Sequence, residues 1–496
     1  MTELEFQALA AQGFNRIPLI TECLADLDTP LSVYCKLNAS GRRANSFLLE
    51  SVEGGERFGR YSFIGVSARR LIRSRDRQIQ VLVDGEVTEQ LEGDPLEFVR
   101  QFRKRFKVAL RPGLPRFCGG LAGYFGYDLV RFIEPTLGPC TKPDPVGTPD
   151  MQFLLVDELA IVDNLKGRLY LIVYADTTMP DAWAQTQKRL RELRRRLSEA
   201  VDEPADSVSL ESEIIRDFAK DDYLQAAQQA RELIIAGELM QVQIGQLIRK
   251  PFIHSPLTLY RALRTINPSP YMYYYDFGDF QVVGASPEIL VRQDTPEAGA
   301  PSITIRPIAG TRRRGLTQQQ DDILAKELLA DPKERAEHLM LIDLARNDVG
   351  RIAQPGSVRV TEKMVIEKYS HVQHIVSNVQ GELMPGLDEI DVLRASFPAG
   401  TLTGAPKVRA MQVIDDLEIT RRGIYGGAVG YLSWSGHMDV AIAIRTGIVK
   451  DGMLNVQAAA GIVYDSKPEL EWQETEMKAR AVLKAAELVE AGLETV

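Results

Sequence analysis

The sequence lacks long hydrophobic runs and has few of the residues that build disulfide or metal frameworks. No stretch of about 18 apolar residues occurs, so we expect no transmembrane span. The N-terminus lacks the basic start and apolar core of a signal peptide and predicts a short amphipathic helix. The cysteines have no disulfide or metal-binding spacing, which favours free thiols in a reducing cytoplasm; they are Cys23, Cys35, Cys118 and Cys140.

An excess of positive charge is also absent. Lys and Arg number 59 against 68 Asp and Glu, a net charge of −9, which argues against a nucleic-acid partner. There is no short-period repeat and no low-complexity tract. With 496 residues, 45% of them hydrophobic, the chain is typical of a globular protein of about two to four domains.

The first part of the chain predicts mostly antiparallel strands. From Pro30 to Ala175, short apolar runs alternate with Gly, Asp and Asn. Examples of these runs are 32–37, 45–52, 60–66, 78–83, 153–162 and 168–175. Asp181 to Val201 predicts a charged helix, and the Pro-, Ser- and acid-rich segment 203–213 predicts a linker. We therefore expect an N-terminal domain over 20–200 and a C-terminal domain over 215–490.

The stretch from Asp331 to Gly350 predicts a sharply starting, largely buried helix. Asp331 can cap it, Pro332 fits the first turn, and Glu334 has the spacing of a capping box. Glu334 and Glu337 lie one turn apart and share a face. Buried carboxylates are costly without a cation, so this helix indicates a cationic partner.

A second helix, predicted from Pro468 to Gly492 with Ser466 as its cap, offers a similar pair in Glu471 and Glu474. Two such pairs could hold a hard divalent cation such as Mg²⁺, which needs few protein carboxylates. The alternative is that acidic residues simply favour helix N-termini. Spacing alone leaves both interpretations open.

Two apolar strands near the C-terminus are predicted at 439–449 and 453–464. Arg445 lies in the first of them. A buried arginine needs an anion, which is either a substrate carboxylate or an internal Asp or Glu.

Six segments occur in an order that resembles the chorismate-utilising enzymes. They are PIAGT (307–311), RAEHLMLIDLARNDVGR (335–351), FPAGTLTGAPK (397–407), GGAVGY (426–431), AIAIRT (441–446) and EWQET (471–475). The N-terminal segments LLESV (48–52), GRYSFIG (59–65) and GGLAGYFGYDLVRFIE (119–134) agree with this resemblance. It covers about residues 20 to 490, and six long segments in order are more specific than any one of them.

The resemblance implies a fold and a set of binding residues. The fold is α/β (α+β), with two large antiparallel sheets packed as a sandwich and helices outside. Mg²⁺ would be bound by Glu337 and Glu474, with Glu334 and Glu471 in the outer shell. The implied chorismate-binding positions are Gly310, Thr311, Tyr425, Arg445 and a turn of Ala459, Ala460 and Gly461.

The resemblance also implies a reaction, which is amination of chorismate at C2 by ammonia followed by pyruvate elimination to give anthranilate. Glu288 would protonate the departing hydroxyl, which requires a raised pKa, and His374 would assist the elimination. Gln241 stands where isochorismate and salicylate synthases have a basic lysine, and Ala309 stands where aminodeoxychorismate synthase has a nucleophilic lysine. Both residues favour anthranilate formation.

Three alternatives remain open at this point. They are an aminodeoxychorismate-forming enzyme, an anthranilate-forming enzyme of a phenazine or quinolone pathway, and a non-catalytic subunit that binds tryptophan. The sequence also departs from the related patterns at QVQIGQ (241–246), in place of a QVVPS-type segment, and at AAAGIV (458–463), in place of AGAGIV.

The resemblance finally implies regulation and a partner. Ser51, Pro270, Tyr271 and Met272 match a tryptophan-binding site, so feedback inhibition is expected, although an ordinary strand and turn would also explain these segments. No amidotransferase Cys-His-Glu arrangement is found. Ammonia is therefore expected from a separate glutamine amidotransferase subunit, in a cytoplasmic hetero-oligomer.

Overall fold

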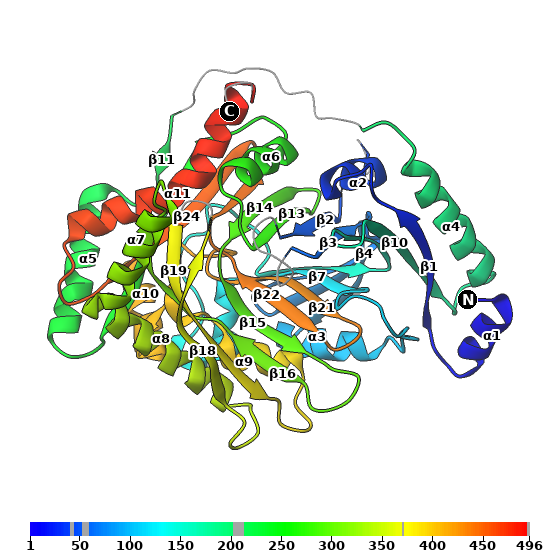
Figure 1. Ribbon diagram of the computed structural model, residues 1–496, viewed down its shortest axis with the longest axis horizontal. Helices are drawn as coiled ribbons and strands as arrows, with labels where there is room; N and C mark the ends of the chain where they lie inside the picture. Colours follow the sequence, from blue (N-terminus) through cyan, green and yellow to red (C-terminus); the bar gives the residue numbers. More distant parts are fainter. Residues whose placement is uncertain (40–43, 52–58, 202–212, 370–371, 494–496) are drawn as a thin grey trace.

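The computed structural model describes residues 1–39, 44–51, 59–201, 213–369 and 372–493, and these residues form two large β-sheets. Each sheet has twelve strands within these ranges, and neighbouring strands are antiparallel. Helices lie outside the sheets (Figure 1). The predicted sandwich of two antiparallel sheets with flanking helices is confirmed.

We call the two sheets A and B. Sheet A has the strand order β1 (Arg16–Leu24), β10 (Arg168–Asp176), β9 (Glu158–Asp163), β3 (Tyr61–Gly65), β2 (Ser46–Glu50), β13 (Tyr271–Asp276), β14 (Phe280–Ser286), β23 (Thr446–Lys450), β24 (Met453–Ile462), β12 (Gln241–Pro251) and β11 (Ile215–Arg216), and β20 (Gly404–Ala405) also pairs with β12. Sheet B has the order β17 (Ile308–Arg313), β19 (Val372–Glu382), β16 (Ser302–Ile305), β15 (Ile289–Asp294), β22 (Met438–Ile442), β21 (Ala428–Ser433), β7 (Gly120–Phe125), β8 (Met151–Val156), β4 (Arg70–Arg75), β5 (Gln78–Val83) and β6 (Glu86–Glu92), and β18 (Arg359–Lys368) also pairs with β19.

An aromatic core fills the space between the two sheets. Phe63 of sheet A packs edge-on against Tyr431 of sheet B, with ring centroids 5.7 Å apart. Tyr431 in turn stacks on Phe117 at 4.3 Å. Aromatic rings contribute large buried areas and prefer such edge-on or offset contacts. This layer therefore holds the sandwich together.

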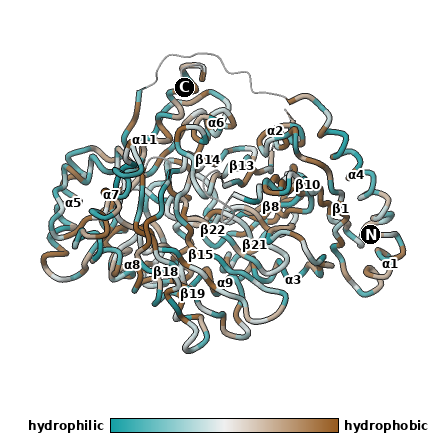
Figure 2. Tube along the Cα trace, in the orientation of Figure 1, coloured by the Kyte–Doolittle hydropathy of each residue, from teal (hydrophilic) through white to brown (hydrophobic). Residues whose placement is uncertain are grey.

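The helices cover the outer faces. They are α1 (Glu3–Ala11), α2 (Pro30–Leu37), α3 (Pro95–Lys104), α4 (Ala182–Arg196), α5 (Lys220–Ile235), α6 (Pro256–Ile266), α7 (Gln318–Ala330), α8 (Pro332–Gly350), α9 (Glu389–Ser396), α10 (Lys407–Leu417) and α11 (Pro468–Glu490), with short 3₁₀ turns η1 (Tyr127–Phe132), η2 (Pro135–Leu137) and η3 (Gly400–Leu402). Buried residues of α2, α4, α6 and α11 pack on sheet A, and those of α3, α8 and α9 pack on sheet B. Helix α4 is mainly hydrophilic along its trace (Figure 2). No helix within the described ranges has the length and apolarity needed to cross a membrane.

Two neighbouring crossovers carry the chain between the sheets. β14 of sheet A leads through Pro287 and Glu288 into β15 of sheet B, and β22 of sheet B leads through 443–445 into β23 of sheet A. The crossovers are bonded to each other. The Ile442 amide donates to the Glu288 carbonyl at 3.0 Å, and the Ala285 amide donates to the Arg445 carbonyl at 3.1 Å.

Three expectations about local structure were wrong. Segment 32–37, predicted as a strand, lies in α2, because Thr29 caps this helix in a capping box with Ser32 and Pro30 occupies its first turn. Segment 439–449 is two strands of different sheets, because the chain crosses at Arg445. Residues 459–461 are not a turn; they lie within β24.

The predicted helix over 331–350 is confirmed as α8, with the Asp331 side chain accepting the amides of Lys333 and Glu334. The capping box was wrong. The Asp331 amide is already bonded to the Glu327 carbonyl at the end of α7, and Glu334 turns instead to Arg312. The terminal helix α11 is confirmed, but Ser466 does not cap it; its hydroxyl accepts the Val463 amide.

Strands from both predicted domains share each sheet. β2 pairs with β13 in sheet A, and β7 pairs with β21 in sheet B. The division into 20–200 and 215–490 stays a prediction, and the predicted linker lies almost wholly outside the described residues, apart from Glu213.

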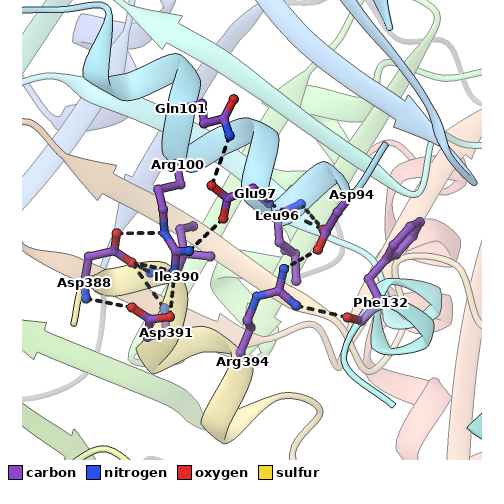
Figure 3. Close-up of polar contacts among 10 residues, drawn as sticks. All are labelled: Asp94, Leu96, Glu97, Arg100, Gln101, Phe132, Asp388, Ile390, Asp391 and Arg394. Carbon is purple, nitrogen blue, oxygen red and sulfur yellow. Dashed lines mark hydrogen bonds and ion pairs between the residues drawn. The ribbon is translucent and has the colours of Figure 1, made fainter. Parts of the chain in front are cut away.

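Helices α3 and α9, which are far apart in the sequence, are joined by ion pairs (Figure 3). Asp388 caps α9 and also binds Arg100 of α3, with the Arg100 Nε 2.8 Å from the Asp388 Oδ2. Reciprocally, Asp94 caps α3 and binds Arg394 of α9. Each cap is therefore held by an arginine of the other helix.

We predict that Asp388→Ala lowers the free energy of unfolding by about 1 to 3 kcal/mol, because it removes a cap and a partly buried arginine partner. Urea unfolding measures this change. Asp343→Ala, which removes an exposed ion pair with Arg346, is the control and should change stability by less than about 0.5 kcal/mol. Equal effects of the two substitutions would contradict the role of the α3–α9 contact.

Candidate active site

A cavity of about 370 Å³ opens where the two crossovers meet helices α8 and α11. Six residues predicted as catalytic, substrate-binding or metal-binding line it, namely Gln241, Glu288, Thr311, Glu337, His374 and Arg445. They come from β12, the β14–β15 crossover, β17, α8, β19 and the β22–β23 crossover. The fold thus brings together residues spread over 200 positions of the sequence.

Glu288 is a half-buried residue on the first crossover, and its carboxyl group faces the cavity. Burial raises its pKa to about 8, and a hydrogen bond with Thr401, whose Oγ1 lies 3.2 Å from the Glu288 Oε1, lowers it only in part. The carboxyl group is therefore protonated at neutral pH and can donate a proton. The raised pKa predicted for this residue is confirmed.

His374 on β19 faces a bulge in β17. Its Nδ1 lies 2.9 Å from the Gly310 carbonyl and 3.1 Å from the Thr311 hydroxyl. Because a carbonyl only accepts, Nδ1 carries the proton and Nε2 carries the lone pair. Burial lowers the pKa of His374, so the neutral, basic imidazole is favoured.

Gly310 makes this contact possible. It forms the bulge between Ala309 and Thr311 with φ +66°, a left-handed conformation that favours glycine. A Cβ at this position would lie 3.0 Å from Oε2 of Glu334. The bulge therefore sits directly against α8.

Arg445 occupies the second crossover with φ +52°, and its side chain is half-buried. Burial lowers its pKa, and Tyr425 and Glu474 act in the opposite direction. In the portion of the chain that the structure describes, its guanidinium forms no ion pair. A half-buried guanidinium that faces a cavity without a carboxylate partner is suited to an anionic ligand.

Tyr425 lies beside Arg445. Burial raises the pKa of its hydroxyl, which also interacts with the Ala459 backbone and with Arg445. Ala459 and Gly461 of β24 share the face that Gln243 of β12 presents, because Gly461 pairs with Gln243. Ala460 points to the opposite, helix-covered face, and Ala459, Ala460 and Gly461 are not among the residues that line the cavity.

The four glutamates of α8 and α11 influence one another. Burial raises the pKa of Glu337, and the charges of Glu334 and Glu474 raise it further. Burial and the charge of Glu474 likewise raise the pKa of Glu471. Two basic groups partly offset this charge, since Arg312 pairs with Glu334 at 3.2 Å and Lys478 pairs with Glu474 at 2.7 Å.

These carboxylates fit a divalent cation. Burial is the main cause of the raised pKa values of Glu337 and Glu471, and the neighbouring carboxylates add to it. A cation between the two helices would relieve the repulsion among these carboxylates. No group of three or more acidic, His or Cys side chains converges as a metal site among the residues described. Mg²⁺ nevertheless needs only one or two protein carboxylates, because it keeps several water ligands.

The four residues predicted to bind an effector line a second, smaller cavity of about 100 Å³. Ser51, Pro270, Tyr271 and Met272 meet there between β2, β3, β13 and β21. Pro270 also lines the larger cavity, so segment 267–270 forms a wall between the two.

Lys478 and Thr401 line the larger cavity but were not predicted. The Lys478 ammonium binds Glu474 and also donates to the Ala459 carbonyl at 2.9 Å. Its position one helical turn after Glu474 was the signal that could have revealed it. Thr401 gave no such signal, because its contact with Glu288 joins residues 113 positions apart.

Comparisons with known proteins agree with this geometry. A family model described as chorismate binding enzyme matches residues 44–484. Anthranilate synthase component 1 of Neisseria meningitidis serogroup A is 52% identical over all of both chains, and that of Pseudomonas aeruginosa is also 52% identical over all of both. The crystal structure of anthranilate synthase component I from Streptococcus pneumoniae has a TM-score of 0.75 at 37% identity, covering 87% of this chain and 94% of that one.

The raised pKa of Glu288 predicts a pH-dependent effect on stability. The folded protein keeps this proton up to about pH 8, whereas the unfolded chain releases it near the ordinary value of 4.5. Stability is therefore lost as pH rises through this window, and Glu288→Gln removes the loss. In urea unfolding, the free energy of unfolding of Glu288→Gln minus that of the parent protein should increase by on the order of 3 kcal/mol between pH 5 and pH 8.

The exposed Glu297→Gln is the control and should show no such growth. A pH-independent difference for Glu288→Gln would contradict a protonated Glu288.

Proposed function

This chain belongs to the family of chorismate-binding enzymes, and from that premise we propose that it is the chorismate-binding component of an anthranilate synthase. It aminates chorismate with ammonia and eliminates pyruvate to form anthranilate. The observation that carries the proposal is the cavity itself, where a protonated acid, a neutral histidine and a guanidinium without an ion-pair partner among the described residues face one ligand-sized space.

Glu288 acts as the general acid. Ammonia forms the new C–N bond at C2, and the C4 hydroxyl leaves as water after taking the proton of Glu288. The hydrogen bond with Thr401 orients the carboxyl group. Burial keeps it protonated at neutral pH.

His374 acts in the second step. Its Nδ1 proton is held by the Gly310 carbonyl, so Nε2 is free to take the ring proton as the C–O bond to the pyruvate-forming side chain breaks. The electrons of that C–H bond complete the aromatic ring.

Arg445, Thr311 and Tyr425 bind the substrate. The fork-shaped guanidinium pairs with a carboxylate of chorismate through two hydrogen bonds, an arrangement that lysine does not reproduce. Mg²⁺ would be held by Glu337 and Glu474, with Glu334 and Glu471 behind them, and would withdraw electron density from the ring carboxylate as a Lewis acid.

Two residues favour this reaction over those of related enzymes. Ala309 lines the cavity and offers no amine for covalent attack. Gln241 is neutral and cannot activate water as a basic lysine would. Ammonia needs no such base, because its lone pair is available for attack.

The enzyme works with a partner subunit in the cytoplasm. A separate glutamine amidotransferase subunit supplies the ammonia, in keeping with the component 1 designation of the relatives. The enzyme works in the cytoplasm, where the four cysteines, all free thiols, are stable.

Tryptophan inhibits the enzyme from the second cavity. Tyr61, Phe63 and Tyr431 provide aromatic surface there, and Glu50, beside Ser51, provides a carboxylate for an amino group. Segment 267–270 separates this cavity from the active site. Tryptophan bound in the second cavity therefore shifts this segment and changes the shape of the active-site cavity.

We predict that the purified chain converts chorismate, ammonium and Mg²⁺ to anthranilate and pyruvate, detected by anthranilate fluorescence and by pyruvate reduction. Chelation of Mg²⁺ should abolish the activity. Formation of aminodeoxychorismate without anthranilate would refute the proposal. The variant Ala309→Lys, which introduces the lysine that the parent protein lacks, is assayed beside it for comparison.

We also predict that Ser51→Leu raises the inhibition constant of tryptophan about tenfold or more, because the larger side chain fills the second cavity. Initial rates at increasing tryptophan concentrations measure this, and the uninhibited rate should be retained. Ser198→Leu, at an exposed position two residues after the end of α4, is the matched control. Inhibition of Ser51→Leu equal to that of the parent protein would exclude this cavity as the effector site.

A further inference from the structure

Arg422 is a buried residue between α10 and β21 that forms an ion pair with Glu418. The two residues are 4% and 3% exposed. The Arg422 Nη2 lies 2.6 Å from the Glu418 Oε1, and its Nε lies 3.0 Å from the Oε2. No step of the proposed reaction involves either residue. The desolvation of a buried pair often cancels its attraction, so stability alone does not explain the pair.

The guanidinium of Arg422 holds two parts of the wall of the active-site cavity. Its Nη1 donates to the Leu402 carbonyl at 2.7 Å, and its Nη2 also donates to the Gln243 carbonyl at 3.1 Å. Leu402 and Gln243 both line the cavity. Glu418 adds a third contact, because its Oε1 accepts the Gly245 amide at 2.7 Å. The ion pair therefore ties the turn η3 to strand β12.

The bond to η3 matters because this turn carries Thr401. The Thr401 Oγ1 lies 3.2 Å from the Oε1 of Glu288, and Leu402 is the next residue of the turn. A turn of three residues has few hydrogen bonds of its own to fix it. A guanidinium is planar and rigid and can bond several acceptors at once, so it fixes the position of Leu402 against β12.

We propose that Arg422 is a positioning residue for the general acid Glu288, an inference that rests on the proposed function. The guanidinium fixes Leu402, and the adjacent Thr401 then directs the carboxyl group at the departing hydroxyl. Glu418 holds the guanidinium in the plane that reaches both wall carbonyls. The acid is thus oriented by a side chain that does not touch the substrate.

A double-mutant cycle tests the inference, with steady-state formation of anthranilate from chorismate, ammonium and Mg²⁺ as the assay. Arg422→Lys keeps the charge but offers a point donor that cannot bridge both carbonyls and the carboxylate. Its kcat should fall about tenfold or more, because the acid is misdirected. Its KM for chorismate should stay within about threefold. The ring of Tyr425 lies 5.7 Å from the guanidinium carbon, and an ammonium can keep such a contact.

Thr401→Val removes the hydroxyl that contacts Glu288 and should lower kcat to a similar extent. The kcat of the double variant should lie within about twofold of the slower single variant, because both substitutions break the same connection. A defect of general structure in Arg422→Lys would instead multiply the loss caused by Thr401→Val.

Arg196→Lys is the matched control. Arg196 is also buried, pairs with a glutamate four residues earlier, Glu192, and donates to a backbone carbonyl, that of Leu37, at 3.1 Å. It does not line the active-site cavity. The substitution removes the same kind of contacts as Arg422→Lys and should leave kcat and the KM for chorismate unchanged.

An unchanged kcat in Arg422→Lys overturns the inference, and so does a double variant whose loss equals the product of the two single losses. If Arg422→Lys does not fold, as measured by circular dichroism, Glu418→Gln replaces it in the cycle and is judged by the same two outcomes, because it leaves the guanidinium without its carboxylate. If the unmodified chain forms no anthranilate, the proposed function itself fails, which is a different outcome from either of these.

Discussion

The active site depends on a constraint of the fold, which is the pair of bonded crossovers between the two sheets. At these crossovers the chain passes once from sheet A to sheet B and once from sheet B to sheet A. Backbone hydrogen bonds between Ile442 and Glu288 and between Ala285 and Arg445 hold the two crossovers together. Side chains at a crossover belong to neither sheet face. Glu288 and Arg445 therefore turn toward the cavity instead of packing into the core.

Helices α8 and α11 add the second component, a concentration of negative charge. Their carboxylates raise the pKa of one another, and Lys478 and Arg312 offset the charge only in part. The crossovers supply an acid and a guanidinium, and the helices supply the carboxylates that we propose as Mg²⁺ ligands. A dianionic substrate such as chorismate can bind the guanidinium at one end and a cation at the other.

The sequence predicted elements whose signals are local and missed those set by distant contacts. Helix α8 was predicted from Asp331 and Pro332, which act within one turn. The crossover at Arg445 was missed, because an apolar run contains no sign that it changes sheets. The capping box at Glu334 was wrong for the same reason, since α7 had already engaged the Asp331 amide. Six residues of the candidate site could be predicted from family resemblance, but Thr401 and Lys478 needed the structure.

The most direct test of this account is the dissociation constant of chorismate, measured by calorimetry in the presence of Mg²⁺ for variants at the two crossovers. Arg445→Gln should weaken binding about tenfold or more, because a charged hydrogen-bonding group is lost. Glu288→Gln should bind chorismate within about twofold of the parent protein while its turnover falls by about a hundredfold or more. Binding of chorismate to Arg445→Gln as tight as to the parent protein would contradict the assignment of the crossovers as the substrate site.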